Sequence, residues 1–357
     1  MRLPVSLVFF YPYVRRNMRA LLKPVSKIMS VPSLLSVTKL GATAAAVVVL
    51  SGTSFAQDQY PNQPLRIIVP FAAGGGTDIT ARLLGEQLRG ILRQSAVIDN
   101  RPGNAGMIGT RAVAKGAAPD GYTLLVASGE MAVNAHLYKV MPYDWEKDLT
   151  PISNLVKVPS VIVVNADVPA KNVQELIAYA KANPKTVSYG STGAGGMTHL
   201  GMEHFSKMAG VQIIHVPYKG ASQQLADVAG KHITMTLSSI AATLPFIDSG
   251  KVKTIAVTSA GRVSSMPTVP AVAELLPGYE FINFIGFYAP ANLPDPILRK
   301  LNAAAVQALK NPEQMAKLKD LGFEPAPDTP EQFRVFVRAQ SKLFAKIIVD
   351  ANVKIDQ

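Results

Sequence analysis

Short apolar runs alternate with stretches of helical period from Leu65 to Ala289, and this alternation limits the possible folds most strongly. LRIIVPF (65–71) predicts a buried strand, and the apolar residues from Ile79 to Leu92 recur at the spacing of one helix face. Strands apolar at nearly every position are typical of parallel sheets that helices cover on both faces. The sequence therefore predicts an α/β fold with mainly parallel sheets flanked by helices. Further strands are expected at 95–98, 122–128, 160–165, 186–190, 212–218, 232–238, 251–259 and 281–289.

The chain from Asp295 onward is expected to be mostly helical. Asp295-Pro296 and Thr329-Pro330 each place a capping residue before a proline at the first helical position, and Gln332 completes a capping box. Breaks are expected near 310–313 and at 325–330, and no strand is expected after Ala289.

The first 56 residues differ in composition from the rest. They hold seven Lys and Arg and no Asp or Glu, and they end in an 11-residue apolar segment (40–50) followed by small residues at Ser54 and Ala56. This pattern is typical of a secretory signal peptide (1–56) cleaved before Gln57. The apolar segment is shorter than the roughly 20 residues that span a bilayer. We therefore expect a soluble periplasmic protein, with Met1, Met18 or Met29 as the translation start.

The absence of cysteine excludes a lipid anchor on a new N-terminal cysteine, disulfides and thiolate metal sites. Without the seven cations of the leader, the net charge falls from +12 to about +5, and no basic cluster remains. Nucleic acid is therefore not expected as a partner.

The stretch VPFAAGGGTD (69–78), called here the first glycine turn, leaves a predicted strand and enters a predicted helix. Glycines at such a turn expose backbone N–H groups at the positive end of a helix dipole, which attracts an anion. A tight structural turn is the alternative. The turn lacks GK[ST] and GxGxxG, so a nucleotide loop has little support, and the absence of GxSxG disfavours a serine hydrolase.

Asp78 allows two interpretations. An acid in the first helical turn stabilises the helix by a few tenths to about 1 kcal/mol. Alternatively, Asp78 accepts hydrogen bonds from the turn's N–H groups or contacts an amino or hydroxyl group of a ligand.

A similar turn recurs about 115 residues later in SYGSTGAGGMTH (188–199), the second glycine turn. Two such turns at the carboxyl ends of strands suggest two half-structures that face each other across a ligand crevice. The five histidines show no zinc-binding spacing, and His199 with Glu203 is expected to be a structural pair. Lys219 is either a solvated lysine or a counter-charge.

Five stretches together resemble the Bug family, the periplasmic receptors of tripartite tricarboxylate transporters. They are YPNQPLRIIVPFAAGGGTDITARLLGEQL, NRPGNAGMIGTRAVAKGAAPDGYTLLVAS, YGSTGAGGMTHLGMEHF, VPYKGASQQLADVAGKHITM and KTIAVTSAGRVSSMPTVPAVAE. The resemblance runs in order from Tyr60 to the C-terminal helices. It implies a two-domain, Venus-flytrap binding protein of the type II periplasmic class that closes on a small carboxylate.

The resemblance also implies domain bounds and ligand-binding residues. Domain 1 would comprise 57–158 plus 281–357, and domain 2 would comprise 159–280. The positions that match the family's ligand contacts are Phe71, Gly74, Gly75, Gly76, Thr77 and Asp78 in the first turn, Ser191, Thr192, Gly195 and Thr198 in the second, and, more loosely, Ser128, Tyr218 and Gly220. Ser238 and Ser239 stand near a place that often carries an acid, which favours a ligand without an amine.

The sequence thus predicts a periplasmic solute receptor that delivers a small organic carboxylate to a pair of membrane permease subunits. The receptor is expected to be a monomer without catalytic residues, metal or cofactor. A receptor that signals through a membrane sensor kinase is the alternative. An enzyme on the same scaffold lacks a nucleophile–base pair.

Overall fold

The computed structural model of the protein describes residues 60–218 and 220–355. The predicted signal peptide and Lys219 lie outside these residues. Ten strands are present in the described part: β1 (Leu65–Val69), β2 (Ala96–Asn100), β3 (Thr123–Ser128), β4 (Leu149–Asn165), β5 (Ser188–Ser191), β6 (Ile214–Pro217), β7 (Met235–Ser239), β8 (Val252–Val257), β9 (Ile282–Pro290) and β10 (Glu324–Pro325).

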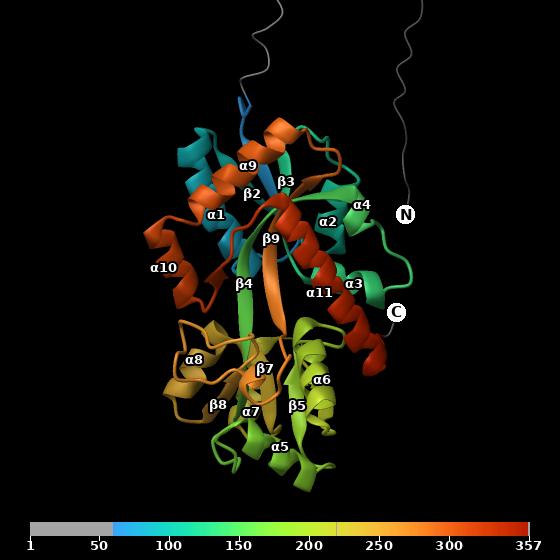
Figure 1. Ribbon diagram of the computed structural model, residues 1–357, viewed down its shortest axis with the longest axis vertical. Coiled ribbons are helices and arrows are strands. Elements are labelled where there is room, and N and C mark those ends of the chain that lie inside the picture. The colour runs from blue at the N-terminus through green and yellow to red at the C-terminus, as the bar shows by residue number, and fades with distance from the viewer. Residues whose placement is uncertain (1–59, 219, 356–357) are drawn as a thin grey trace, which may run out of the picture. The chain divides into compact units, whose positions relative to one another are not determined.

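Helices fill the connections between most of these strands (Figure 1). They are α1 (Gly76–Leu92), α2 (Met107–Ala114), α3 (Glu130–Leu137), α4 (Trp145–Asp148), α5 (Val173–Ala182), α6 (Met197–Ala209), α7 (Ala221–Ala229), α8 (Ile240–Asp248), the 3-10 helix η1 (Val272–Glu274), α9 (Asp295–Ala308), α10 (Pro312–Asp320) and α11 (Pro330–Asp350).

The strands pair in the order β2-β1-β3-β9-β4-β7-β5-β6, and β8 and β10 also pair with β4. β4 changes partners along its length: residues Leu149 to Pro159 pair with β9, and residues Ser160 to Asn165 pair with β7 and β8. We call β1, β2, β3, β9, β10 and the first part of β4 the first sheet region, and β5 to β8 with the rest of β4 the second sheet region.

The α/β class is confirmed, but the prediction of mainly parallel sheets needs a correction. Among the described strands, parallel ladders join β1 with β2 and β3, and β5 with β6 and β7. β4 and β9 pair antiparallel with all their neighbours. The apolar pattern reports burial on both faces, and it does not distinguish the direction of a neighbouring strand.

β4 begins 11 residues earlier than the sequence predicted, at Leu149 in place of residue 160. The added stretch contains prolines at 151 and 159, which cannot donate to a ladder. Shifts of the β4–β9 register between Pro151 and Ser153 and between Asn154 and Val156 accommodate the irregularity.

The C-terminal helices and both breaks between them match the prediction, with two corrections. β10 is a strand after Ala289, and it pairs antiparallel with β4. Pro294, and not Asp295, is the N-cap of α9, and no side chain caps this helix. Thr329 and Gln332 do form the predicted capping box at the start of α11.

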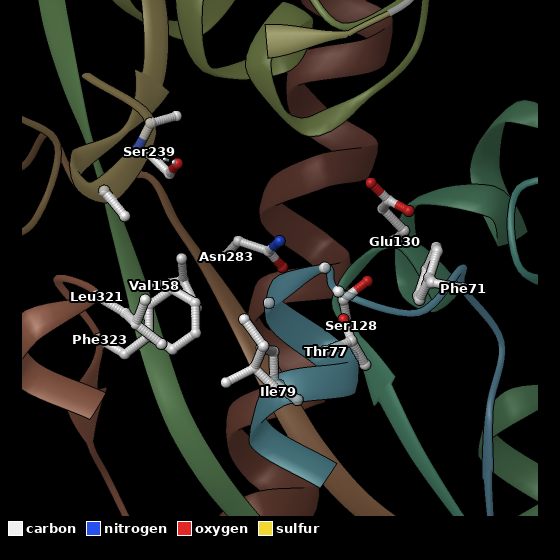
Figure 2. A pocket seen from close by; sticks show the side chains of 16 residues that line it. Phe71, Thr77, Ile79, Ser128, Glu130, Val158, Ser239, Asn283, Leu321 and Phe323 are labelled. Carbon is white, nitrogen blue, oxygen red and sulfur yellow. Dashed lines mark hydrogen bonds between the residues drawn. The ribbon is translucent and has the colours of Figure 1, made fainter. Parts of the chain in front are cut away.

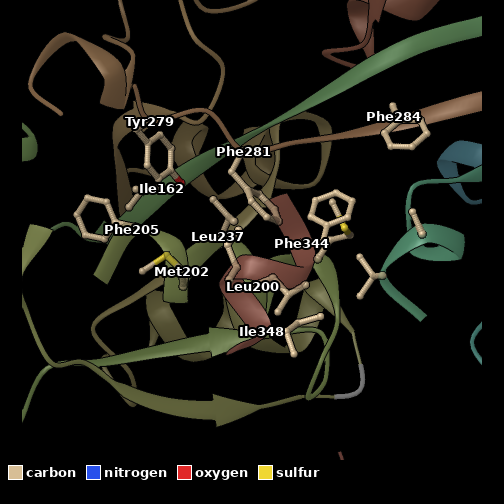
Figure 3. Close-up of a cluster of buried hydrophobic side chains, with 14 of the residues drawn as sticks. Ile162, Leu200, Met202, Phe205, Leu237, Tyr279, Phe281, Phe284, Phe344 and Ile348 are labelled. Carbon is tan, nitrogen blue, oxygen red and sulfur yellow. The ribbon is translucent and has the colours of Figure 1, made fainter. Parts of the chain in front are cut away.

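The largest buried cluster joins residues of both sheet regions through α11 (Figure 3). Phe344 of α11 is fully buried, and its ring lies 5.9 Å from that of Phe281. Leu200 and Phe205 of α6 belong to the same cluster. Helix α11 also packs along α3. Its apolar face therefore connects elements that are far apart in the sequence.

Candidate functional site

The first glycine turn connects β1 to α1, and its backbone requires glycine at one position. Gly74 has φ +85, a conformation that residues with a Cβ rarely adopt. Gly75 is the N-cap of α1 with an extended backbone, and no side chain caps the helix. The N–H groups of Gly75, Gly76 and Thr77 donate to no acceptor in the described chain. Unpaired N–H groups at a helix N-terminus can bind an anion.

The buried carboxylate of Asp78 fixes the first glycine turn by hydrogen bonds. Its carboxylate accepts hydrogen bonds from the Gly74 N–H (2.8 Å), from Arg82 Nε (2.9 Å) and from Asn100 Nδ2 (2.9 Å), and the residue is 2% exposed. Burial acts to raise the pKa of Asp78, but the hydrogen bonds from Arg82, Gly74 and Asn100 outweigh it and hold the pKa below its ordinary value. Through these hydrogen bonds, Asp78 rigidifies the first glycine turn.

A cavity of about 610 Å3 opens in front of the turn (Figure 2). Both sheet regions contribute to its wall, and Val158 lies where β4 passes from one to the other. The lining residues are Phe71, Gly74, Gly75, Gly76, Thr77, Ile79, Ser128, Glu130, Val158, Ser239, Ala241, Ala242, Asn283, Ile285, Leu321 and Phe323.

The polar groups of this cavity are largely hydrogen-bond donors. The buried Ser128 Oγ has no partner in the described chain. Asn283 Oδ1 accepts the N–H groups of Gly129 (3.2 Å) and Phe284 (2.8 Å), which fixes the side-chain amide and leaves its N–H2 group without a described acceptor. Apolar side chains, among them Phe71 and Phe323, form much of the remaining wall. This combination suits an acceptor-only group such as a carboxylate.

The structure therefore brings together one part of the predicted site, namely Phe71, Gly74, Gly75, Gly76, Thr77 and Ser128. Asp78 lies directly behind them. The second glycine turn, with Ser191, Thr192, Gly195 and Thr198, is not in the lining of this cavity, and neither are Tyr218 and Gly220. The contribution of these residues to ligand binding stays a prediction.

The second glycine turn is bonded within itself. The Thr192 N–H donates to Thr198 Oγ1 (2.9 Å), and Ser191 Oγ lies 2.6 Å from His215 Nε2. Gly195 has φ +76, and a Cβ there would lie 2.7 Å from Leu137 of α3. Its N–H donates to His199 Nδ1 (2.9 Å). Burial, with a smaller effect of the stacked His215, lowers the pKa of His199 to about 4, so this imidazole is neutral and can accept the bond.

Tyr218 and Gly220 lie at the next strand-to-helix connection, between β6 and α7. The Tyr218 hydroxyl donates to Asp227 Oδ2 (2.7 Å), and Gly220 is the N-cap of α7 with an extended backbone.

Sequence reasoning missed two polar residues of the cavity, Glu130 and Asn283. Ser239, which the sequence placed only near a position that often carries an acid, also lines it. Glu130 lies two residues after Ser128, which the resemblance had marked as a looser ligand position. Asn283 lies within a strand pattern and carries no motif.

Within residues 60–218 and 220–355, no three His, Cys, Asp or Glu side chains gather in a way that could hold a metal ion. The same segments contain no helix that is long and apolar enough to cross a membrane.

Comparison with known proteins agrees with this fold. Residues 80–353 match the family described as Tripartite tricarboxylate transporter family receptor. Protein BugT of Bordetella pertussis is 34% identical over 328 residues, covering 90% of this chain and all of BugT. The solved structure of the periplasmic binding protein BugD is 34% identical with a TM-score of 0.69, covering 83% of this chain and 99% of BugD. The structure of R. palustris Rpa4515 with adipate is 33% identical with a TM-score of 0.72, covering 83% of this chain and 99% of that one.

The fold is that of a two-domain periplasmic solute-binding protein, with a cavity beside a glycine turn. The chain belongs to the tripartite tricarboxylate transporter receptor family, which includes the Bug proteins and is a family of solute receptors. The resemblance drawn from the glycine turns and their flanking sequences is confirmed.

Proposed function

We propose that this protein captures a small organic carboxylate in the cavity beside the first glycine turn and delivers it to the membrane permease subunits of a tripartite tricarboxylate-type transporter. One observation carries the proposal. Three unpaired backbone N–H groups at the start of α1 line a cavity together with the Ser128 hydroxyl and the Asn283 amide. A carboxylate offers only acceptors, so each of these donors gains a partner when it binds.

The relative with bound adipate supports the same class of ligand. We extend the proposal to the predicted site residues. Phe71, Gly74, Gly75, Gly76 and Thr77 contact the carboxylate with Ser128, and Asp78 rigidifies their turn. Ser191, Thr192, Gly195 and Thr198, with Tyr218 and Gly220, form the opposite side in the ligand-bound state.

This extension requires closure of domain 2 (159–280) on domain 1 (57–158 plus 281–357). β4 changes partners at Pro159, and β9 begins at Ile282, which are positions where two strands could act as a hinge. The signal-peptide pattern before Gln57 supports export to the periplasm, where the receptor works as a monomer.

A thermal-shift assay with mono-, di- and tricarboxylates tests the proposal. We expect at least one acid, with adipate as the first candidate, to raise the melting temperature, because a ligand that binds only the folded state at 100 times its Kd adds about 2.7 kcal/mol. Neutral amides of the same acids serve as controls and should give no shift. The proposal would be wrong if no carboxylate in the panel stabilised the protein.

A further inference from the structure

Glu130 is a polar residue of the cavity to which the proposed function gives no role. It is the first residue of α3, directly after β3 and Gly129, and its half-buried side chain lines the cavity. In Figure 2 it lies on the side of Ser128 and Phe71, while Val158, Leu321 and Phe323 line the other side. Its carboxyl group makes no hydrogen bond or ion pair with any described residue. An unpaired carboxyl group in a cavity otherwise rich in donors requires an explanation.

No other charge in the described surroundings compensates Glu130. It is the only ionisable side chain among the residues that line the cavity. β3 carries none, and Asp78 in the neighbouring turn is paired with Arg82. On α3 itself, His136 is bonded to Ser341 of α11.

The remaining charged groups lie on α4 and α11, which pack against α3. Most of them form ion pairs with each other or with neighbours, and Lys342 of α11 forms none with a described residue. The pairs are Lys147–Asp144, Lys115–Asp148, Arg338–Glu146, Arg334–Glu331 and Lys346–Asp350.

The protonation of Glu130 is therefore controlled by burial and not by a neighbouring charge. Burial raises the pKa of Glu130 to about 7, and no charged neighbour contributes to the shift. A carboxylate bound at the first glycine turn would bring a negative charge into the same cavity, and this charge would raise the pKa further. Two carboxylates that share a site without a cation between them cannot both stay ionised at low cost, so one of them takes up a proton.

We propose that Glu130 is a ligand-contacting selectivity residue that binds in its neutral form and donates its O–H to an acceptor oxygen of the bound acid. This inference rests on the proposed function, and it defines the ligand more closely. The preferred ligand carries one carboxylate for the first glycine turn and a second acceptor group, such as the second carboxylate of a dicarboxylic acid, for Glu130. An O–H···O⁻ bond of this kind is short and strong. Where Glu130 of the free protein is ionised, binding of the acid takes up one proton from solution.

Because protonation of Glu130 and binding of the acid are coupled, the affinity depends on pH in a defined direction. The form of the free protein that can bind has a protonated Glu130, and its fraction falls as the pH rises through about 7. Affinity is therefore full below this pH, and it decreases up to tenfold per pH unit above it until the pKa of the complex is reached. Between pH 6.5 and 8.5, where a dicarboxylate ligand is itself ionised, the Kd should rise by more than about tenfold.

The experiment is isothermal titration calorimetry of the purified protein with adipate at pH 6.5 and 8.5, repeated at pH 7.5 in two buffers of different ionisation enthalpy. We expect the Kd to rise with pH and the apparent enthalpy to change with the buffer in the direction of proton uptake. Glu130→Gln keeps a neutral hydrogen-bond donor. Its Kd should vary less than about twofold over this pH range, and it should bind adipate more tightly than the unsubstituted protein at pH 8.5.

A matched control is Glu331→Gln, which removes an exposed carboxylate on α11 outside the cavity. It should retain the full pH dependence. Adipate binding with a pH-independent Kd and no proton uptake would overturn the role of Glu130 and leave the proposed function standing. Tighter binding at high pH would show that an ionised Glu130 is required, and loss of binding in Glu130→Gln at every pH would show that a neutral donor at this position does not suffice. Either result would overturn the inference as well. No binding of adipate or of any other acid in the panel at either pH would overturn both proposals.

Discussion

Individual residues of the first glycine turn have separate tasks. Gly74 supplies a backbone conformation with positive φ, and its N–H is tied to Asp78. Gly76 leaves room for Phe323, whose ring would lie 2.8 Å from a Cβ at this position. Gly75 has neither constraint. Its φ is −80, and a Cβ there would approach no atom closer than the Ala72 carbonyl oxygen at 3.7 Å. Of the three glycines, Gly75 alone can be replaced without strain in the turn.

Gly75→Val should therefore separate binding from folding. We expect a stability loss of only about 1 kcal/mol, since valine is a poorer N-cap than glycine. The affinity for a carboxylate should fall by more than about 100-fold, because a side chain at this position enters the space in front of the N–H groups. Thermal denaturation and calorimetric titration measure the two effects.

Gly90→Val is the matched control, because it makes the same substitution in α1 at a position with open space outside the cavity. It should bind as the unsubstituted protein does. An unchanged affinity in Gly75→Val would rule out the first glycine turn as the carboxylate site.

At the scale of elements, the sequence predicted the strands, helices and turns that are determined by residues close together in the chain. Strand β1, helix α1 and the glycines between them could be recognised, because their pattern and composition determine the turn. The length of β4 could not be recognised, because strand formation at Leu149 to Pro159 depends on pairing with β9, more than 110 residues later. Asn283 reaches the cavity through this pairing of β9 with β4, and Ser239 through the pairing of β7 with β4. Ser128, in contrast, ends a strand that was recognisable on its own.

Helix α11 provides a test of packing at this scale, because its apolar face joins the largest core cluster. Phe344→Ala should lower the free energy of unfolding by about 3–5 kcal/mol, since a fully buried ring is replaced by a cavity. Val349→Ala, on the same helix but 77% exposed, should change it by less than about 0.5 kcal/mol. Urea denaturation followed by circular dichroism measures both. A loss below about 1 kcal/mol for Phe344→Ala would contradict the role of α11 in joining the core.

At the scale of the whole molecule, the cavity combines the carboxyl end of β1 and the start of α1 with residues that the long strands bring from elsewhere. Val158 and Ser239 reach it through β4 and its pairing with β7, and Asn283 reaches it through β9. This arrangement explains why the sequence could indicate the first glycine turn as part of the cavity but not the complete lining. It also changes the expectation about an acid in the site: Ser238 and Ser239 lack one, but Glu130 supplies a carboxyl group from α3.

The most direct test of the central claim is a crystal structure of the protein with adipate. We predict one carboxylate of adipate within hydrogen-bonding distance, about 2.7–3.2 Å, of the N–H groups of Gly75, Gly76 and Thr77. Adipate bound elsewhere on the protein, with the first glycine turn unoccupied, would contradict the account.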